Sequence, residues 1–217
     1  MKKAVAFLAV ILSVFAVFAS KAEMRTGVQL GYGFERESAW SDTTKVVLDY
    51  SGLRFSGTFE YGFADSLYAK AVLGFFNIGE GYYSLEGPSP FYSYTPDAAP
   101  VNIGVYLGAE YAYDIGSSFS LSGGLGFDVL LGEMWTLGSL EYEGPGAVFN
   151  ARMGIAGEVT GSYRINDALA VNLGGRFAWH FYDSDKCNRE FKKEAAEYGW
   201  SWFGYSYDFF AGVTYSL

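Results

Sequence analysis

The chain has almost no cysteine or histidine. Of its 217 residues, one is cysteine, Cys187, and one is histidine, His180. A single cysteine excludes an intrachain disulfide. A metal site built from thiolate and imidazole ligands would need more of both, so no metal site and no cofactor are expected.

Long apolar runs are also missing from most of the chain. After residue 22 no segment approaches the ~20 consecutive apolar residues of a transmembrane helix. Half of all residues are nevertheless hydrophobic and 19% are aromatic. These residues are spread evenly along the chain, which is typical of a β protein whose apolar surface faces lipid.

Basic residues are outnumbered. The chain has 15 Lys and Arg against 24 Asp and Glu, for a formal net charge of -9. Residues 1–22 hold three lysines and no acid, so the remainder carries about -12. Nucleic acid needs basic surfaces and is not an expected partner.

The N-terminus has the pattern of an export signal. Lys2 and Lys3 precede an apolar run over 4–19, and Ser20 and Ala22 are small residues before a cleavage site. We therefore predict a cleavable signal peptide over 1–22 and one domain over 23–217. A transmembrane anchor and a cut after Ala19 are the alternatives.

Strand-like alternation dominates the rest of the chain. From Leu67, apolar residues occupy every second position for about a dozen residues, while the opposite face carries both polar and apolar residues. This is longer than the ~5–6 residues of a globular strand and suits the ~9–11 of a tilted membrane strand. The same alternation predicts eight strands, near 28–35, 53–61, 67–76, 101–113, 119–131, 149–163, 169–181 and 203–217.

The connections alternate in length. Three are tight polar turns after Tyr61, Tyr113 and Tyr163. Four are longer, near 36–46, 80–100, 133–146 and 182–200. Short turns on one side and long loops on the other are typical of outer-membrane barrels, with the termini on the short-turn, periplasmic side. The fold class predicted is all-β, an eight-stranded antiparallel transmembrane β-barrel after a signal peptide.

In this architecture the chain resembles the small eight-stranded outer-membrane proteins, the group of the OmpA transmembrane domain, OmpX and OmpW. The resemblance covers 24–217 and rests on strand and turn pattern rather than on a motif. Members commonly end in an aromatic residue, whereas this chain ends Tyr215-Ser216-Leu217. The resemblance implies a multi-pass protein of the bacterial outer membrane, with a monomer favoured. The partners it implies are the membrane lipid and the barrel-insertion machinery.

The inward face is predicted to hold charges of both signs. An eight-stranded barrel has room inside for little more than its own side chains. Buried charges must be paired, so a salt-bridge network that plugs the lumen is expected, with a narrow polar path as the alternative. Its predicted members are Arg54, Glu60, Lys70, Glu110, Asp128, Arg152, Glu158, Arg176 and Asp208.

No catalytic residues are predicted. His180 is expected to point inward near the outer rim, close to Asp183 and Asp185, but no serine lies beside it on the same strand face. The chain is therefore not expected to be an enzyme.

One long connection is rich in aromatic residues and prolines. Prolines keep the segment from Gly81 to Pro100 out of regular pairing. Its aromatic side chains predict an extracellular binding surface, or rings packed together over the barrel mouth. These residues are Tyr82, Tyr83, Phe91, Tyr92 and Tyr94.

Two functions are considered, of which the first is the predicted one and the second its alternative. One is a narrow conduit or binding site for small, possibly hydrophobic molecules, which would need an apolar vestibule near the outer rim. Phe76, Leu130 and Trp202 are candidates to line it. The other is a structural or adhesive surface barrel with a plugged lumen, whose outer loops would meet host surface ligands.

Overall fold

The computed structural model of the protein describes residues 23–40, 45–86, 93–94, 101–135, 147–183 and 201–217. These residues form long β-strands joined by turns. Within these ranges no helix is long and apolar enough to cross a membrane. The strands are β1 (Met24–Trp40), β2 (Lys45–Ala64), β3 (Leu67–Glu86), β4 (Ser93–Tyr94), β5 (Val101–Ile115), β6 (Phe119–Trp135), β7 (Ala147–Arg164), β8 (Leu169–Asp183) and β9 (Ser201–Ser216).

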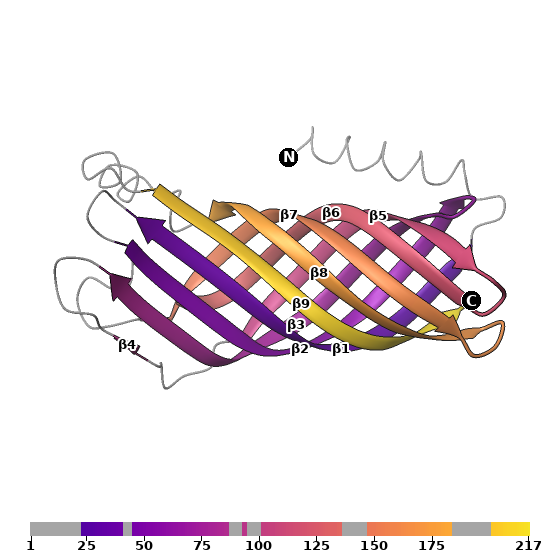
Figure 1. Ribbon diagram of the computed structural model, residues 1–217, viewed down its shortest axis with the longest axis horizontal. Helices are drawn as coiled ribbons and strands as arrows, with labels where there is room; N and C mark the ends of the chain where they lie inside the picture. Colours follow the sequence, from indigo (N-terminus) through magenta and orange to yellow (C-terminus); the bar gives the residue numbers. More distant parts are fainter. Residues whose placement is uncertain (1–22, 41–44, 87–92, 95–100, 136–146, 184–200) are drawn as a thin grey trace.

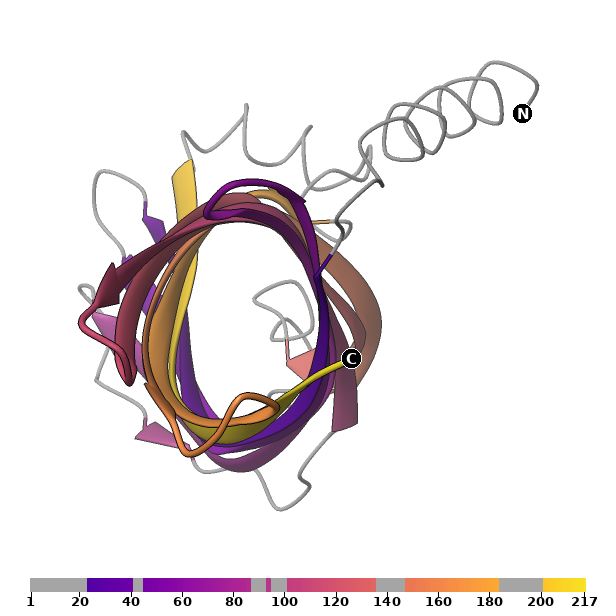
Figure 2. The same ribbon diagram turned by 90° about the vertical axis from the view of Figure 1, so that its right-hand side faces the viewer.

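The eight long strands close into a barrel. Each pairs antiparallel with its neighbours in the order β2-β1-β9-β8-β7-β6-β5-β3, and pairing of β2 with β3 completes the ring. β4 is only two residues long and pairs with the outer part of β3. Figure 1 shows the strands tilted across the barrel, and Figure 2 shows the closed ring end-on. The predicted fold class is confirmed.

Tight turns gather at one end of the barrel. Ser66, with φ of 63°, and Gly116, with φ of 77°, adopt the left-handed backbone that such turns require. The backbone amide of Leu217 donates to the carbonyl of Met24, so both ends of the barrel domain also lie there. We call this the short-turn end (right-hand side of Figure 1). In an outer-membrane barrel it faces the periplasm.

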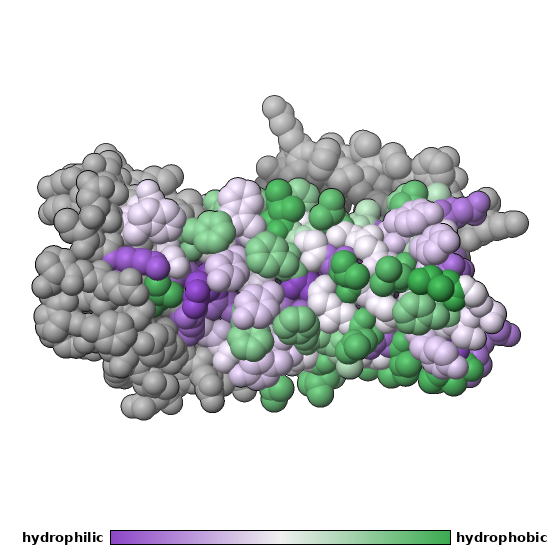
Figure 3. All heavy atoms as spheres, in the orientation of Figure 1, coloured by the Kyte–Doolittle hydropathy of each residue, from purple (hydrophilic) through white to green (hydrophobic). Residues whose placement is uncertain are grey.

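Alternation along each strand separates an apolar exterior from a polar interior. Leu125 and Leu173 on the outside are 71% and 70% exposed, whereas Leu130 inside is 2% exposed. Hydrophobic side chains cover much of the barrel wall in Figure 3. In water such a wall would be an aggregation surface, whereas in a bilayer it matches the acyl chains.

The strands are longer than predicted. β1 runs to Trp40 and β2 begins at Lys45, so the expected long connection over 36–46 is wrong and most of it is a hairpin. β3 likewise continues to Glu86, into the connection expected over 80–100. Since ~9–11 residues cross a bilayer, strands of 15 to 20 residues continue beyond it.

Candidate functional site

The lumen contains a group of charged residues near its short-turn third. The ammonium of Lys70 lies 3.2 Å from Glu60, 3.0 Å from Glu110 and 2.6 Å from Glu158. Arg176 shares Glu158, with its Nε 2.9 Å from the same carboxylate. We call these five residues the inner cluster. It joins five different strands across the barrel interior, so it holds opposite walls together.

Above the inner cluster, rings and guanidinium groups fill the lumen. The guanidinium of Arg176 lies 4.4 Å from the centre of the Tyr106 ring, and that of Arg54 lies 4.9 Å from the centre of Phe76. Arg54 also donates to Asp208 over 2.5 Å. A void of about 10 Å³ beside Arg54, Arg176 and Asp208 is no larger than a single water. This level of the lumen is packed.

A second charged group lies toward the outer end. Arg152 contacts three carboxylates, those of Glu35 and Glu37 at 2.6 Å each and that of Asp183 at 2.8 Å. The hydroxyl of Tyr50 accepts a further bond from Arg152 at 3.3 Å. We call these five residues the outer cluster. All are buried, so the barrel has two successive ionic layers along its axis.

The structure places all nine charged residues predicted for the lumen inside the barrel, each at most 9% exposed. It divides them between the inner cluster, the packed middle and the outer cluster. Sequence reasoning missed three buried acids of the outer cluster. Glu37 and Asp183 fall in the predicted connections over 36–46 and 182–200, and Glu35, at the end of a predicted strand, is not among the predicted lumen charges. Within the described residues, buried carboxylates outnumber Arg and Lys, with three acids around each of Lys70 and Arg152.

His180 lies inside between the middle and the outer cluster. Its Nδ1 is 3.9 Å from Glu35, and its Nε2 is 3.8 Å from Asp128 and 3.5 Å from the hydroxyl of Ser206. Ser206 belongs to β9, which pairs with β8, so its position beside His180 does not follow from the alternation along β8 alone. The imidazole is 3% exposed and these contacts are long for hydrogen bonds. The group therefore lacks the geometry and the access of a nucleophile with its base.

The expected apolar vestibule near the outer rim is not seen among the described side chains. Phe76 and Leu130 do point inward, but they are 1% and 2% exposed and belong to the packed lumen. The side chain of Trp202 lies outside the described residues. The same holds for the predicted aromatic surface: Phe91 and Tyr92 are outside the described ranges, and only the backbones of Tyr82, Tyr83 and Tyr94 are described.

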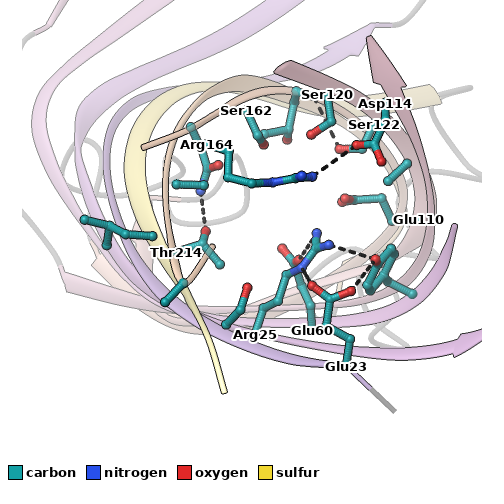
Figure 4. Close-up of a pocket in the computed structure, with 18 of the residues that line it drawn as sticks. Glu23, Arg25, Glu60, Glu110, Asp114, Ser120, Ser122, Ser162, Arg164 and Thr214 are labelled. Carbon is teal, nitrogen blue, oxygen red and sulfur yellow. Dashed lines mark hydrogen bonds and ion pairs between the residues drawn. The ribbon is translucent and has the colours of Figure 1, made fainter. Parts of the chain in front are cut away.

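Open space is found at the short-turn end. A cavity of about 290 Å³, which we call the vestibule, lies between the barrel mouth and the inner cluster (Figure 4). One side is lined mainly by charged residues of β1, β2, β3 and β5, and the other mainly by short hydroxyl and amide side chains of β6 to β9 and their turns, with Arg164 and Asp167 among them. Among the described residues, no group of three or more His, Cys, Asp or Glu is arranged to hold a metal ion.

Comparison with known proteins supports the fold. No protein-family model and no curated protein sequence matches the chain. Solved structures do. The outer membrane protein OprG from Pseudomonas aeruginosa is similar with a TM-score of 0.53 at 17% identity, over 89% of this chain and 95% of that one. Neisserial surface protein A is similar with a TM-score of 0.51 at 12% identity, over 88% and 96%.

At these identities the likeness concerns the fold alone. The closed ring of eight long strands, the tight turns at one end and the apolar wall agree with it. The chain is therefore an eight-stranded β-barrel of the bacterial outer-membrane type, whose apolar wall lies in a lipid bilayer.

Proposed function

We propose that this protein is a sealed, non-enzymatic surface barrel, which spans the outer membrane as an anchor and presents its outer strands and loops. The observation that carries the proposal is the closed lumen. The inner and outer clusters each gather three carboxylates around one cation, and Phe76, Tyr106 and Leu130 fill the level between them. A solute would have to displace buried ion pairs, which costs several kcal/mol per uncompensated charge.

The outer part of the barrel supports the presenting role. The apolar face of β1 ends at Arg36, which forms a bidentate pair with Asp49 on the exterior at 2.5 and 2.7 Å. Beyond this pair the β1–β2 hairpin continues to Trp40, which is 42% exposed. Paired strands that extend past the apolar wall make a rigid stalk for the connections above it. The name of the similar Neisserial protein, a surface protein, agrees with such a role.

A conduit for small hydrophobic molecules is the alternative. It needs an apolar space that opens at the outer rim and leads sideways into the membrane. Two of the residues expected to line that space, Phe76 and Leu130, are packed against the lumen network instead. The tight packing favours the surface barrel over the conduit.

Solute permeability distinguishes the two functions. We expect liposomes containing the refolded barrel to swell no faster than protein-free liposomes in isosmotic glycine or arabinose. We also expect the barrel not to speed the uptake of a small aromatic hydrocarbon into the liposomes. Migration as a folded, heat-modifiable species shows that the barrel has inserted. Faster swelling would overturn the sealed lumen, and faster hydrocarbon uptake would support the conduit.

A further inference from the structure

The vestibule at the short-turn end has a negative balance of charge. Its lining includes five carboxylates, from Glu23, Glu60, Glu110, Asp114 and Asp167, and three cationic groups, from Arg25, Lys70 and Arg164. The cavity is closed at its inner end by Lys70 and its carboxylates. It is thus a dead-end pocket, separate from any path through the lumen.

The cations of the vestibule are already paired with its own walls. Arg25 lies 2.7 Å from Glu23 and donates to the hydroxyl of Tyr68 over 2.7 Å. Arg164 reaches across the mouth to Asp114 at 3.3 Å and donates to the carbonyl of Ser117. Figure 4 shows both guanidinium groups extended over the cavity toward these partners. An anionic ligand would have to compete with these acids for the same donors.

Glu23 precedes β1 and stands at the mouth. Its partial burial alone would raise the pKa of its carboxyl, but the hydrogen bond and the positive charge of Arg25, with a bond from Tyr68, hold that pKa below its ordinary value. This carboxyl is therefore ionised at neutral pH. Asp114 and Asp167 are exposed at the same mouth, where three carboxylates face the two guanidinium groups of Arg25 and Arg164, so the entrance keeps a net negative charge.

Two residues of the hydroxyl wall act as hydrogen-bond acceptors toward the cavity. Ser122 donates its proton to the carbonyl of Thr160 over 3.3 Å, and the hydroxyl of Thr160 donates to Glu158 over 3.2 Å. The Asn172 amide donates to Thr214. With their protons used in this way, Ser122 and Thr160, which line the cavity, can only accept further hydrogen bonds there. Together with the excess of carboxylates, these two acceptors favour a ligand that is rich in donors.

We propose that the vestibule binds a primary ammonium group on a flexible alkyl arm, supplied either by a small diamine or by a lysine side chain of a periplasmic protein. An ammonium brings three donors and one positive charge, which match the lone pairs and the excess carboxylates. The cavity, at about 290 Å³, is near the lower end of the size of ligand pockets, which suits a slender chain. The site opens to the periplasm and carries nothing across the membrane. The proposal is therefore independent of the proposed surface function.

The test is calorimetric titration of the refolded barrel in non-ionic detergent with cadaverine. The neutral control is its diol analogue, in which hydroxyls replace both amines. We expect saturable binding of cadaverine at one site per barrel and none of the diol. Equal binding of cadaverine and the diol would overturn the proposal, because the charge would then have no role.

Two variants of β5 locate the site. Ala112 lines the vestibule, whereas Ala109 on the same strand is exposed on the lipid-facing wall. Ala112→Leu fills the cavity without removing a polar group, and Ala109→Leu adds the same volume outside. Ala112→Leu should weaken cadaverine binding about tenfold or more, the effect of losing charged hydrogen bonds. Ala109→Leu should leave binding unchanged, and equal affinities in the two folded variants would place the ammonium elsewhere.

A second titrant separates the two sources of the ammonium. Acetyl-lysine amide carries one alkylammonium arm on a peptide-like backbone. Tighter binding of this compound than of cadaverine points to a lysine of a periplasmic protein, and weaker binding points to a free diamine. Failure of both compounds to bind contradicts the proposal.

Discussion

Replacement of Arg152 by methionine is expected to lower the free energy of unfolding by about 3–5 kcal/mol, the usual cost of leaving buried charges without their partner. Arg152 is the centre of the outer cluster, where Glu35, Glu37 and Asp183 all contact its guanidinium. Methionine keeps most of the side-chain volume, so the loss reflects the three carboxylates rather than a cavity. The measurement is urea unfolding of the refolded barrel in detergent, followed by tryptophan fluorescence and heat modifiability.

Two further variants make this result specific. Arg36→Met removes a guanidinium from an exterior pair with Asp49, in which both side chains are substantially exposed, and should cost no more than about 1 kcal/mol. Adding Glu35→Gln and Glu37→Gln to Arg152→Met should recover part of the lost stability, because fewer buried charges are then unpaired. Equal effects of Arg152→Met and Arg36→Met, or no recovery, would show that the outer cluster is not held by charge pairing.

Replacement of Gly126 by valine is expected to prevent folding or to destabilise the barrel by about 3 kcal/mol or more, because the lumen there has no room. Gly126 pairs directly with Gly108 on β5, and the ring of Tyr106 lies across both. A Cβ at position 126 would lie 2.6 Å from the Cα of Gly108 and 2.8 Å from Cε2 of Tyr106, and would also meet the carbonyl oxygen of Leu107. Two of these contacts are with backbone atoms and cannot be relieved by a rotamer change.

Gly57→Val is the matched control for this substitution. Gly57 is exposed on the exterior of β2, and a Cβ there would meet only the carbonyl oxygen of Gly27, at 3.9 Å. Since glycine weakens a strand by roughly 0.5–1 kcal/mol relative to alanine, this variant should fold with unchanged or slightly higher stability. The yield of heat-modifiable barrel after refolding compares the two, and equal yields would contradict a tightly packed lumen around Tyr106.

Much of the fold could be predicted from the sequence because a bilayer imposes a contrast on the two faces of each strand. Within the membrane, outward positions such as Leu125 are apolar and inward ones such as Asp128 are polar or small, so alternation marks the strands and their orientation. At the outer end of β1 this contrast is lost. On β1, Glu35 and Glu37 point inward and Arg36 points outward, so no contrast remains to mark the strand. This is why the sequence pattern predicts a connection over 36–46, where β1 and β2 in fact continue.

A local irregularity explains why Asp183 was missed. On β8, Arg176 and His180 face the lumen, and simple alternation would turn Asp183 outward with Phe181. The register between β7 and β8 shifts between Met153 and Gly154, so that His180 pairs with Gly154 and Tyr182 with Met153. The unpaired Phe181 reverses the alternation beyond it, and Asp183 enters the outer cluster opposite Arg152. A bulge of this kind leaves no mark in the hydropathy pattern.

The sequence alone also does not show which residues face one another across neighbouring strands. The inward position of Lys70 follows from its own strand, but its three carboxylates come from β2, β5 and β7 and depend on the register of each pair. Register is set by turn lengths and bulges together, and one residue of slip would reverse every assignment. The vestibule cannot be predicted from the sequence either, because it too depends on the register of neighbouring strands. It exists because short side chains of β6 to β9 lie at the same level of the barrel as the longer charged ones of β1, β2, β3 and β5.

Single-channel recording in a planar bilayer tests the sealed lumen most directly. The refolded, heat-modifiable barrel is expected to insert without discrete current steps, because the inner cluster, the packed rings and the outer cluster close the lumen in succession. Discrete, reproducible openings of the unmodified protein would contradict the account, since ions would then cross a lumen that its ion pairs are inferred to close.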